Sequence, residues 1–274
     1  MNTPTGQLQA TQTFANSARE FLPTQQHPGA IDKLANGTSF ESRLAGGALW
    51  RESLDLLARH VQCVRRKCYA GDLIYRSGDR FDTVFVVVTG LCKEVNLMPD
   101  GREQATGLQF KGDWLGFDGI LTRRHCCYAV AVQLSEIWAV SYPTLMRACA
   151  REPALMQLVL EAISSQLADS RDAMMVMGTL KGDARVGYFL LQWGRSLQAR
   201  GQRTDQISIC LSRADIASHL GMRAESVSRA LTKIAQSGAI EFNEPSRREV
   251  SIPSLDALQD FVQCQTEEIH PAMH

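Results

Sequence analysis

Short apolar segments separated by glycine corners occupy the middle of the chain. From Val64 to Ser141 these segments have the length of strands. Residues 83–89 form an apolar, β-branched run that predicts a buried strand ending at Gly90, and Met98-Pro-Asp-Gly101 is a hairpin turn signal. Short strands at near-regular spacing predict an antiparallel barrel or roll.

Two segments precede this region. Residues 1–40 are rich in Thr, Gln, Asn, Ala, Gly and Pro and have no sustained period, so we expect a mobile N-terminal arm. Residues 43–62 place Leu54, Leu57 and Val61 at steps of three and four, which predicts a helix.

A long helical stretch follows the predicted strands. Glu152 and Pro153 open it, because Pro fits the first turn of a helix. Apolar residues then recur at alternating steps of four and three, as in the seam of a coiled coil. The candidate homodimer seam among them consists of Leu160, Ile163, Leu167, Met174 and Met177. The alternative, a core stripe that packs on the roll, stays open.

A pair of short helices around a glycine dominates the C-terminal part. Ser212 and Asp215 form a capping box at the start of the first helix, and Gly221 supplies the turn to the second. The second helix carries an apolar face made of Val227, Leu231 and Ile234. This arrangement predicts a helix-turn-helix.

Further elements surround the helix pair. Residues 181–199 have a helical pattern, and residues 206–211 alternate like a strand. Residues 240–242 and 250–252 are expected to form a two-stranded wing around the loop at 243–248. The whole segment therefore predicts a winged helix-turn-helix.

Polar residues on the second helix are suited to base reading. The first turns of this helix meet base edges in the major groove, where Arg229 can pair with guanine, Glu225 can accept from cytosine N4 and Ser228 can contact several edges. The candidates for phosphate contacts are Arg213, Arg223, Lys233, Arg247 and Arg248. The alternative is a plain helical hairpin with a solvated charged face.

The composition is that of a globular protein with locally uneven charge. Lys and Arg number 29, as do Asp and Glu, but the segment 181–250 holds eleven Lys and Arg against seven Asp and Glu, which fits a phosphate-facing domain. Neither an apolar run of about 18 residues nor a secretory signal is visible. We therefore expect a cytoplasmic protein with no membrane partner, whose eight cysteines are thiols.

Over roughly residues 56–261 the chain resembles the CRP/FNR family of bacterial transcription regulators. The resemblance rests on Gly-Asp corners at 71–72 and 78–79, on Gly112-Asp-Trp-Leu-Gly-Phe-Asp118, on the long helix and on the winged helix-turn-helix. It implies an α+β fold with a cyclic-nucleotide-binding-like antiparallel β-roll. The expected domains are an arm (1–40), the roll (41–150), a dimerisation helix (151–180) and the DNA-binding domain (181–274).

Within that family the recognition helix is similar to the FNR type. It reads Glu225-Ser-Val-Ser228-Arg229, which matches the E-x-x-S-R pattern, and Ala224 stands where the cyclic-AMP receptor protein has an extra Arg. The resemblance implies a homodimer on double-stranded DNA that reads a palindrome of TTGAT-like half-sites, with RNA polymerase as a further partner. Neither a Gly-rich phosphate loop nor a nucleophile elbow is present, and no His and Cys are spaced as metal ligands, so we expect no catalytic or metal site and no enzyme.

The ligands of two known family signals are missing from this sequence. Cyclic-nucleotide receptors carry a Glu where Phe117 stands and an Arg-Ser pair near Cys127-Tyr128, so no nucleotide is expected. Residues 1–62 contain no Cys, and Trp138 takes the place of a later cluster ligand, so an FNR-type iron–sulfur cluster is not expected either.

The signal, and with it the cofactor, stays open between three alternatives. Haem would use His125 or His60. A thiol switch would use Cys126 and Cys127, whose pKa should be lowered by the neighbouring Arg123, Arg124 and His125, or Cys210, which lies two residues before Ser212. The third alternative is a regulator without a small-molecule signal.

Overall fold

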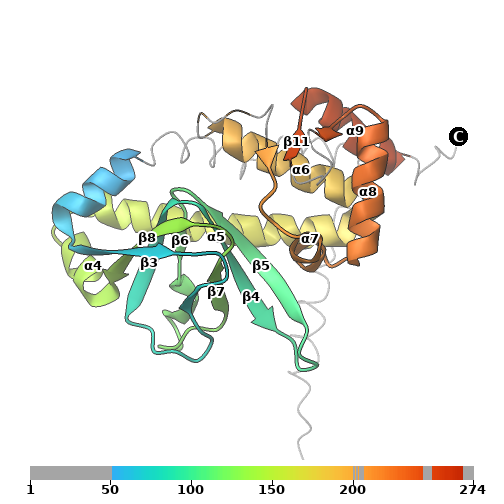
Figure 1. Cartoon of the computed structure of the whole chain (residues 1–274). Coiled ribbons are helices and arrows are strands. Elements are labelled where there is room, and N and C mark those ends of the chain that lie inside the picture. The colour runs from blue at the N-terminus through green and yellow to red at the C-terminus, as the bar shows by residue number, and fades with distance from the viewer. Residues whose placement is uncertain (1–50, 200, 202, 204–206, 243–248, 268–274) are drawn as a thin grey trace, which may run out of the picture. The chain divides into compact units, whose positions relative to one another are not determined.

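The computed structural model describes residues 51–199, 201, 203, 207–242 and 249–267, and the expected arm at 1–40 lies outside them. A helix over residues 51–60 leads into the β-roll. The strands of the roll are β1 (Cys63–Cys68), β2 (Leu73–Tyr75), β3 (Thr83–Thr89), β4 (Leu91–Leu97), β5 (Glu103–Phe110), β6 (Trp114–Leu115), β7 (Tyr128–Ala131) and β8 (Ser135–Ser141). They form two antiparallel sheets, with the orders β1-β8-β3-β6 and β2-β7-β4-β5 (Figure 1).

The apolar run at 83–89 forms β3 and is buried on both of its faces. Successive side chains of a strand point to opposite faces. Val84 and Val86 accordingly join one hydrophobic cluster with Leu57, while Phe85 and Val87 join another. This confirms the sequence-based expectation of a buried strand.

The hairpin between β4 and β5 turns at the predicted site. The backbone N–H of Met98 donates to the carbonyl of Arg102 at 2.8 Å, and Gly101 has a φ of 81°. Gly suits this turn because a left-handed φ strains residues that carry a Cβ. After β6 the chain forms the short 3₁₀ helix η1 (Phe117–Gly119) before it enters β7.

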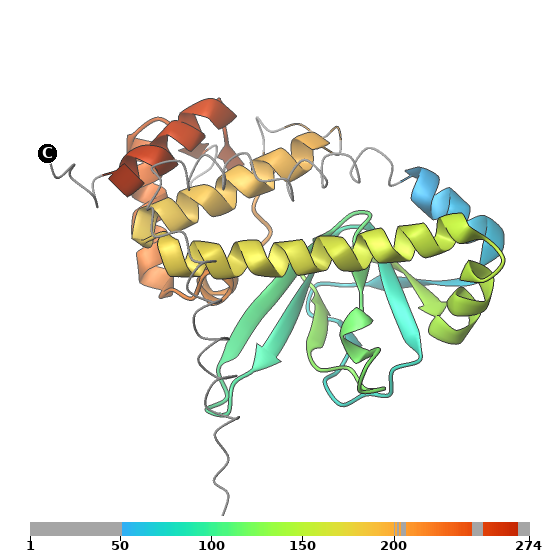
Figure 2. The same cartoon turned by 180° about the vertical axis from the view of Figure 1, so that it is seen from behind.

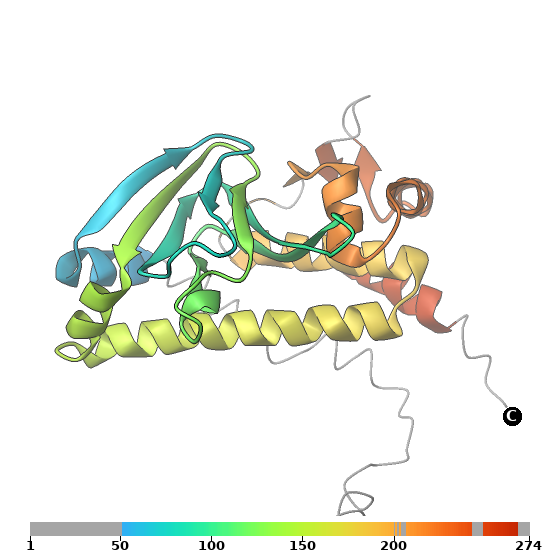
Figure 3. The ribbon, with the colours of Figure 1, turned by 90° about the horizontal axis from the view of Figure 1, so that it is seen from below.

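Two helices follow the roll, α4 (Tyr142–Cys149) and α5 (Pro153–Thr179). Sequence reasoning predicted α5, which Glu152 caps by accepting a hydrogen bond from the N–H of Ala154, and missed α4. The apolar residues of α5 point in two directions. Leu155 and Val159 are buried against the roll, and Gln166 donates to the carbonyl of Trp114 at 2.6 Å. Figure 3 shows α5 running along one side of the roll.

The C-terminal elements are α6 (Gly182–Ala199), β9 (Ile207–Ser208), α7 (Arg213–Leu220), α8 (Ala224–Gln236), β10 (Glu241–Phe242), β11 (Glu249–Ser251) and α9 (Leu255–Glu267). The helix α6 packs against α8 and α9, as Figure 2 shows. The predicted wing strands pair as β10 and β11, and β9 adds a third strand. Within the described residues, no helix has the length and hydropathy needed to cross a membrane.

Candidate nucleic-acid interface and the polar core of the roll

The turn between α7 and α8 has the geometry of a helix-turn-helix. The Oγ of Ser212 accepts from the N–H of Asp215 at 3.0 Å, and the Asp215 carboxylate accepts from the N–H of Ser212 at 3.1 Å. Gly221 then ends α7 in a left-handed conformation, with φ 61° and ψ 40°. Both features are local, and both confirm the predicted start and turn.

The predicted base-reading residues share the exposed face of α8. Glu225, Ser228 and Arg229 are all exposed, and the guanidinium of Arg229 donates to Ser226 Oγ at 3.4 Å. The opposite face is buried in the core of this domain through Val227, Ala230, Leu231 and Ile234. A tightly packed inner face fixes the direction in which the three polar side chains point.

The predicted phosphate contacts differ in their surroundings. Arg223 is exposed at the N-cap of α8, and Arg213 is partly buried at the start of α7. The ammonium group of Lys233 contacts the carboxylate of Asp183 at 2.9 Å and the Oε1 of Gln265 at 2.7 Å. The other two candidates, Arg247 and Arg248, lie outside the described residues.

The seam residues on α5 separate into an exposed stripe and a half-buried one. Leu160, Leu167 and Met174 are spaced seven residues apart and are 54%, 52% and 65% exposed. Met177 is 40% exposed, whereas Ile163 is partly buried against the roll. The helix therefore packs on its own roll with one face and leaves the heptad face open.

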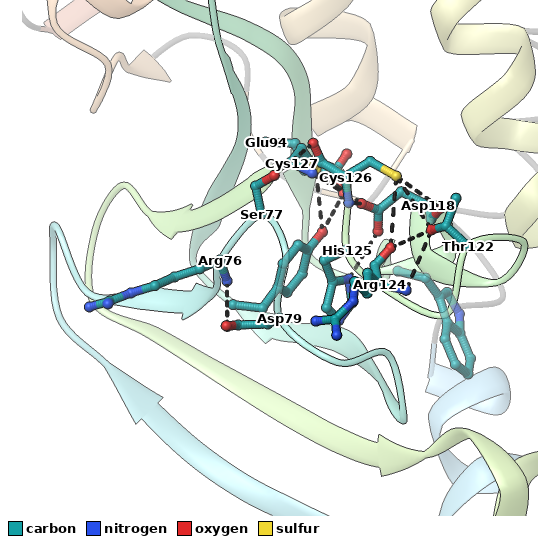
Figure 4. Close-up of polar contacts among 12 residues, drawn as sticks. Arg76, Ser77, Asp79, Glu94, Asp118, Thr122, Arg124, His125, Cys126 and Cys127 are labelled. Carbon is teal, nitrogen blue, oxygen red and sulfur yellow. Dashed lines mark hydrogen bonds and ion pairs between the residues drawn. The ribbon is translucent and has the colours of Figure 1, made fainter. Parts of the chain in front are cut away.

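The carboxylate of Asp118 is the centre of a polar cluster inside the roll (Figure 4). Its Oδ1 lies 3.1 Å from Nδ1 of His125. Its Oδ2 accepts from the N–H of Cys126 at 2.5 Å and from the N–H of Cys127 at 3.2 Å. The His125 ring is buried and stacks on Tyr75, with 4.0 Å between ring centroids.

The balance of burial and hydrogen bonding sets the acidity of this cluster. Burial acts to raise the pKa of Asp118, but hydrogen bonds from His125 and the Cys126 amide outweigh it, so the pKa is lowered. For Cys127, burial and the nearby carboxylates of Glu94 and Asp118 raise the pKa far above its ordinary value.

The expectation that Arg123, Arg124 and His125 lower the pKa of the Cys127 thiol is therefore wrong. The fold buries that thiol near two carboxylates, and the guanidinium of Arg124 donates to the carbonyl of Gly78 at 2.7 Å. The neighbouring thiol, Cys126, is exposed.

The remaining sensor candidates are spread over the chain. His60 lies 4.0 Å from Glu152, whereas His125 has Asp118 as its polar partner, so the two histidines have different surroundings. Cys210 is exposed and donates a hydrogen bond to Gln133. In the part of the chain that the structure describes, no group of three or more His, Cys, Asp or Glu side chains could hold a metal ion.

A second carboxyl group, that of Glu94, lies beside the cluster and was not predicted from the sequence. It accepts from the hydroxyl of Tyr75 at 2.8 Å and from Nε2 of Gln109 at 3.0 Å. Burial raises the pKa of Glu94 to about 7. Glu94 lies in the middle of β4, where apolar and polar residues do not alternate regularly. The sequence therefore does not show that its side chain faces the inside of the roll.

Glu94 and Asp118 also line a cavity of about 450 Å³ between β5, α5 and α6. Among the residues that the structure describes, its other charged lining residues are Asp169 and Asp172, and neither Lys nor Arg lines it. Gln109, which is 6% exposed, contributes an Oε1 that has no hydrogen-bond partner within the described part of the chain. The cavity thus offers carboxylates and a carbonyl oxygen rather than cations.

Comparison with known proteins agrees with this architecture. Residues 65–152 match the family model of a cyclic nucleotide-binding domain, and residues 184–261 match that of a Crp-like helix-turn-helix domain. The nitrogen fixation regulation protein FixK of Bradyrhizobium diazoefficiens is 32% identical over 171 residues, which cover 62% of this chain and 71% of FixK. The chain belongs to the CRP/FNR family of transcription regulators.

Further members of the family support the assignment. The transcriptional activator protein Anr of Pseudomonas protegens is 28% identical over 170 residues, which cover 62% of this CRP/FNR regulator and 70% of Anr. The solved structure of FixK2 from Bradyrhizobium japonicum superposes with a TM-score of 0.66 at 24% identity, covering 73% and 97% of the two chains. These relatives are transcription regulators, so this chain is a DNA-binding regulator and not an enzyme.

The cyclic nucleotide that this fold family implies does not fit the residues present. A nucleotide phosphate needs cationic or N–H donors, and the carboxylate of Asp118 already accepts from Cys126, Cys127 and His125. Among the described residues that line the adjoining cavity, the charged ones are acidic, so they would repel a phosphate. The residues of this roll therefore do not fit a bound cyclic nucleotide.

Proposed function

We propose that this CRP/FNR regulator binds DNA as a homodimer and reads palindromic TTGAT-like half-sites through Glu225, Ser228 and Arg229. The observation that carries the proposal is the position of these three side chains. They are exposed together in the first turns of α8, while the opposite face of the helix is buried. Side chains in this position of a helix-turn-helix reach base edges in the major groove.

Each of the three side chains has a distinct chemical role in the proposal. The planar guanidinium of Arg229 pairs with O6 and N7 of a guanine, and the carboxylate of Glu225 accepts from N4 of a cytosine. Ser228 adds a short donor and acceptor that tolerates several base edges. A TTGAT half-site contains one G·C pair, and this single base pair offers the guanine for Arg229 and the cytosine for Glu225.

The phosphate contacts position the protein without selecting a sequence. Arg223 at the N-cap of α8 and Arg213 at the start of α7 flank the reading face, and we keep Arg247 and Arg248 as candidates in the wing. Lys233 would have to leave Asp183 and Gln265 to reach a phosphate. We therefore expect its substitution to change the affinity for DNA least among these residues.

Dimerisation supplies the symmetry that a palindrome requires. Leu160, Leu167 and Met174 leave a heptad stripe of apolar side chains exposed on α5. Such a stripe is stabilised when a second copy covers it, and a two-fold dimer sets two recognition helices about one turn of DNA apart. The proposed setting is the cytoplasm, with RNA polymerase as the partner at the promoter.

A mobility-shift titration tests the half-site. We expect the protein to prefer a TTGAT palindrome over scrambled DNA of the same composition. Arg229→Ala should weaken specific binding by about 1–3 kcal/mol and relax the preference at the guanine. Arg151→Ala, at an exposed position between α4 and α5, is the matched control and should leave binding unchanged. Equal affinity for both DNAs under reducing and oxidising conditions would refute the proposal.

A further inference from the structure

We infer that Asp118 is a built-in anionic ligand of the roll, and that its carboxylate occupies an anion-binding site formed by the amides of Cys126 and Cys127 and the ring of His125. The inference concerns the regulation of the protein. It goes beyond the proposed half-site and does not depend on which DNA sequence is read.

Four donors converge on this single carboxylate: three are N–H groups, and the other is the thiol of Cys127, whose Sγ lies 3.5 Å from Oδ2. Two of them are consecutive backbone N–H groups, which approach Oδ2 at 2.5 Å and 3.2 Å. The third is His125 Nδ1, which lies 3.1 Å from Oδ1. Successive backbone N–H groups that point to one place form a concavity that binds anions in proteins. Both carboxylate oxygens of Asp118 are therefore engaged, as the phosphate or carboxylate oxygens of a bound ligand would be.

The ring of His125, one of these donors, is held in place by contacts other than Asp118. The ring of His125 stacks on Tyr75 and meets Phe81 edge-on, with 5.6 Å between the centroids of the latter pair. The N–H of His125 donates to the carbonyl of Asp79 at 2.9 Å. A Cβ at Gly116, which has a φ of 94°, would approach the ring at 3.2 Å, so the glycine permits this packing. The surrounding roll thus positions the ring donor of the site without help from the carboxylate.

The carboxylate also reaches the site from a short, constrained element. Asp118 is the central residue of the 3₁₀ helix η1, two residues after Gly116. Although burial acts to raise it, the pKa of Asp118 is lowered, so the site stabilises the charged carboxylate more than water does. Two of the donor residues, His125 and Cys127, are buried. Leaving their donor groups without an acceptor costs free energy, so we expect another anion to bind when this carboxylate is removed.

This arrangement has a consequence for signal response. An effector shifts a protein between two conformations only if it binds one of them more tightly. In this roll the carboxylate of Asp118 already occupies the anion site, so an anionic effector has no site through which to favour one conformation. We expect stability and DNA binding of the wild-type protein to be independent of cyclic AMP, formate and acetate. An anion site should become available only when the Asp118 side chain is shortened.

Chemical rescue tests the inference on the full chain. Asp118→Ala removes the carboxylate, and we expect its thermal midpoint to fall by several degrees and to be restored saturably by sodium formate but not by sodium chloride at equal ionic strength. The wild type should show no saturable response to formate or cyclic AMP. If Asp118→Ala does not fold in chloride, refolding yield in formate against chloride gives the same comparison.

Two further variants separate the anion site from a general loss of structure. Asp118→Asn keeps an oxygen for the two amides and still fills the site, so it should fold, be less stable than the wild type and gain no saturable stabilisation from formate. Asp72→Ala is the matched control, because the Asp72 carboxylate also accepts a backbone N–H, that of Tyr69 at 2.8 Å, but at an exposed turn outside the site.

Three results would overturn the inference. The first is a formate response that is equal in Asp118→Ala, Asp118→Asn and Asp72→Ala. The second is an Asp118→Ala protein as stable as the wild type without formate. The third is saturable stabilisation of the wild type by cyclic AMP. Because the readout is stability, failure of the TTGAT half-site would leave this test unaffected.

Discussion

Replacing Met174 by Glu places a charge in the middle of the proposed seam on α5. The Met174 side chain is 65% exposed in the single chain. Full burial of a Met side chain contributes about 1.5–3 kcal/mol, so covering the exposed part contributes roughly 1–2 kcal/mol for each protomer and twice that for the dimer. In a parallel seam the two Glu side chains would also face each other. We expect dimerisation to weaken by about 3 kcal/mol or more, which is at least about a hundredfold in Kd.

Sedimentation velocity over a range of concentrations measures this change directly. The matched control is Met98→Glu, because Met98 is 47% exposed at the tip of the β4–β5 hairpin and is not part of the seam. Urea unfolding of both variants checks that the fold is retained. A Met174→Glu protein with the dimerisation constant of the wild type would refute the proposed seam. An equal loss in Met98→Glu would show that the effect is not specific to α5.

Two further predictions concern the polar core and an exposed thiol. The pKa of Glu94 is raised by burial from about 4.5 to about 7, so its contribution to stability is fully present below pH 4.5 and is lost as the pH rises through 7. Glu94→Gln should therefore gain stability relative to the wild type between pH 5 and pH 8, on the order of 2 kcal/mol, in urea unfolding. Oxidation by dilute peroxide should reduce DNA binding through Cys210, which lies two residues before the cap of α7, and Cys210→Ser should resist it.

Each of these two predictions has a result that contradicts it. We expect the difference in stability between Glu94→Gln and the wild type to change from pH 5 to pH 8. If this difference stays constant, Glu94 is not the group that titrates. For the thiol, Cys264→Ser is the control, because Cys264 is exposed in α9. If Cys210→Ser loses DNA binding in peroxide as fast as Cys264→Ser, oxidation acts elsewhere.

The sequence by itself determined the features that rest on local spacing. Ser212, Asp215 and Gly221 define the start of α7 and the turn to α8 within ten residues, and the structure reproduces both. The apolar face of α8 follows from helical periodicity, which also leaves Glu225 and Arg229 on the exposed side. Capping, turn conformation and periodicity depend on residues close in the chain, so a sequence can predict them.

Electrostatic surroundings were decided only by the tertiary structure. The residues next to Cys127 in sequence suggested a reactive thiol with a lowered pKa. In the closed roll the thiol is buried beside Glu94 and Asp118, and these surroundings raise its pKa. Lys233 likewise has a helical position that suits a phosphate contact, yet α6 and α9 supply its partners Asp183 and Gln265. Burial and charge partners come from segments far apart in the chain, and no local pattern encodes them.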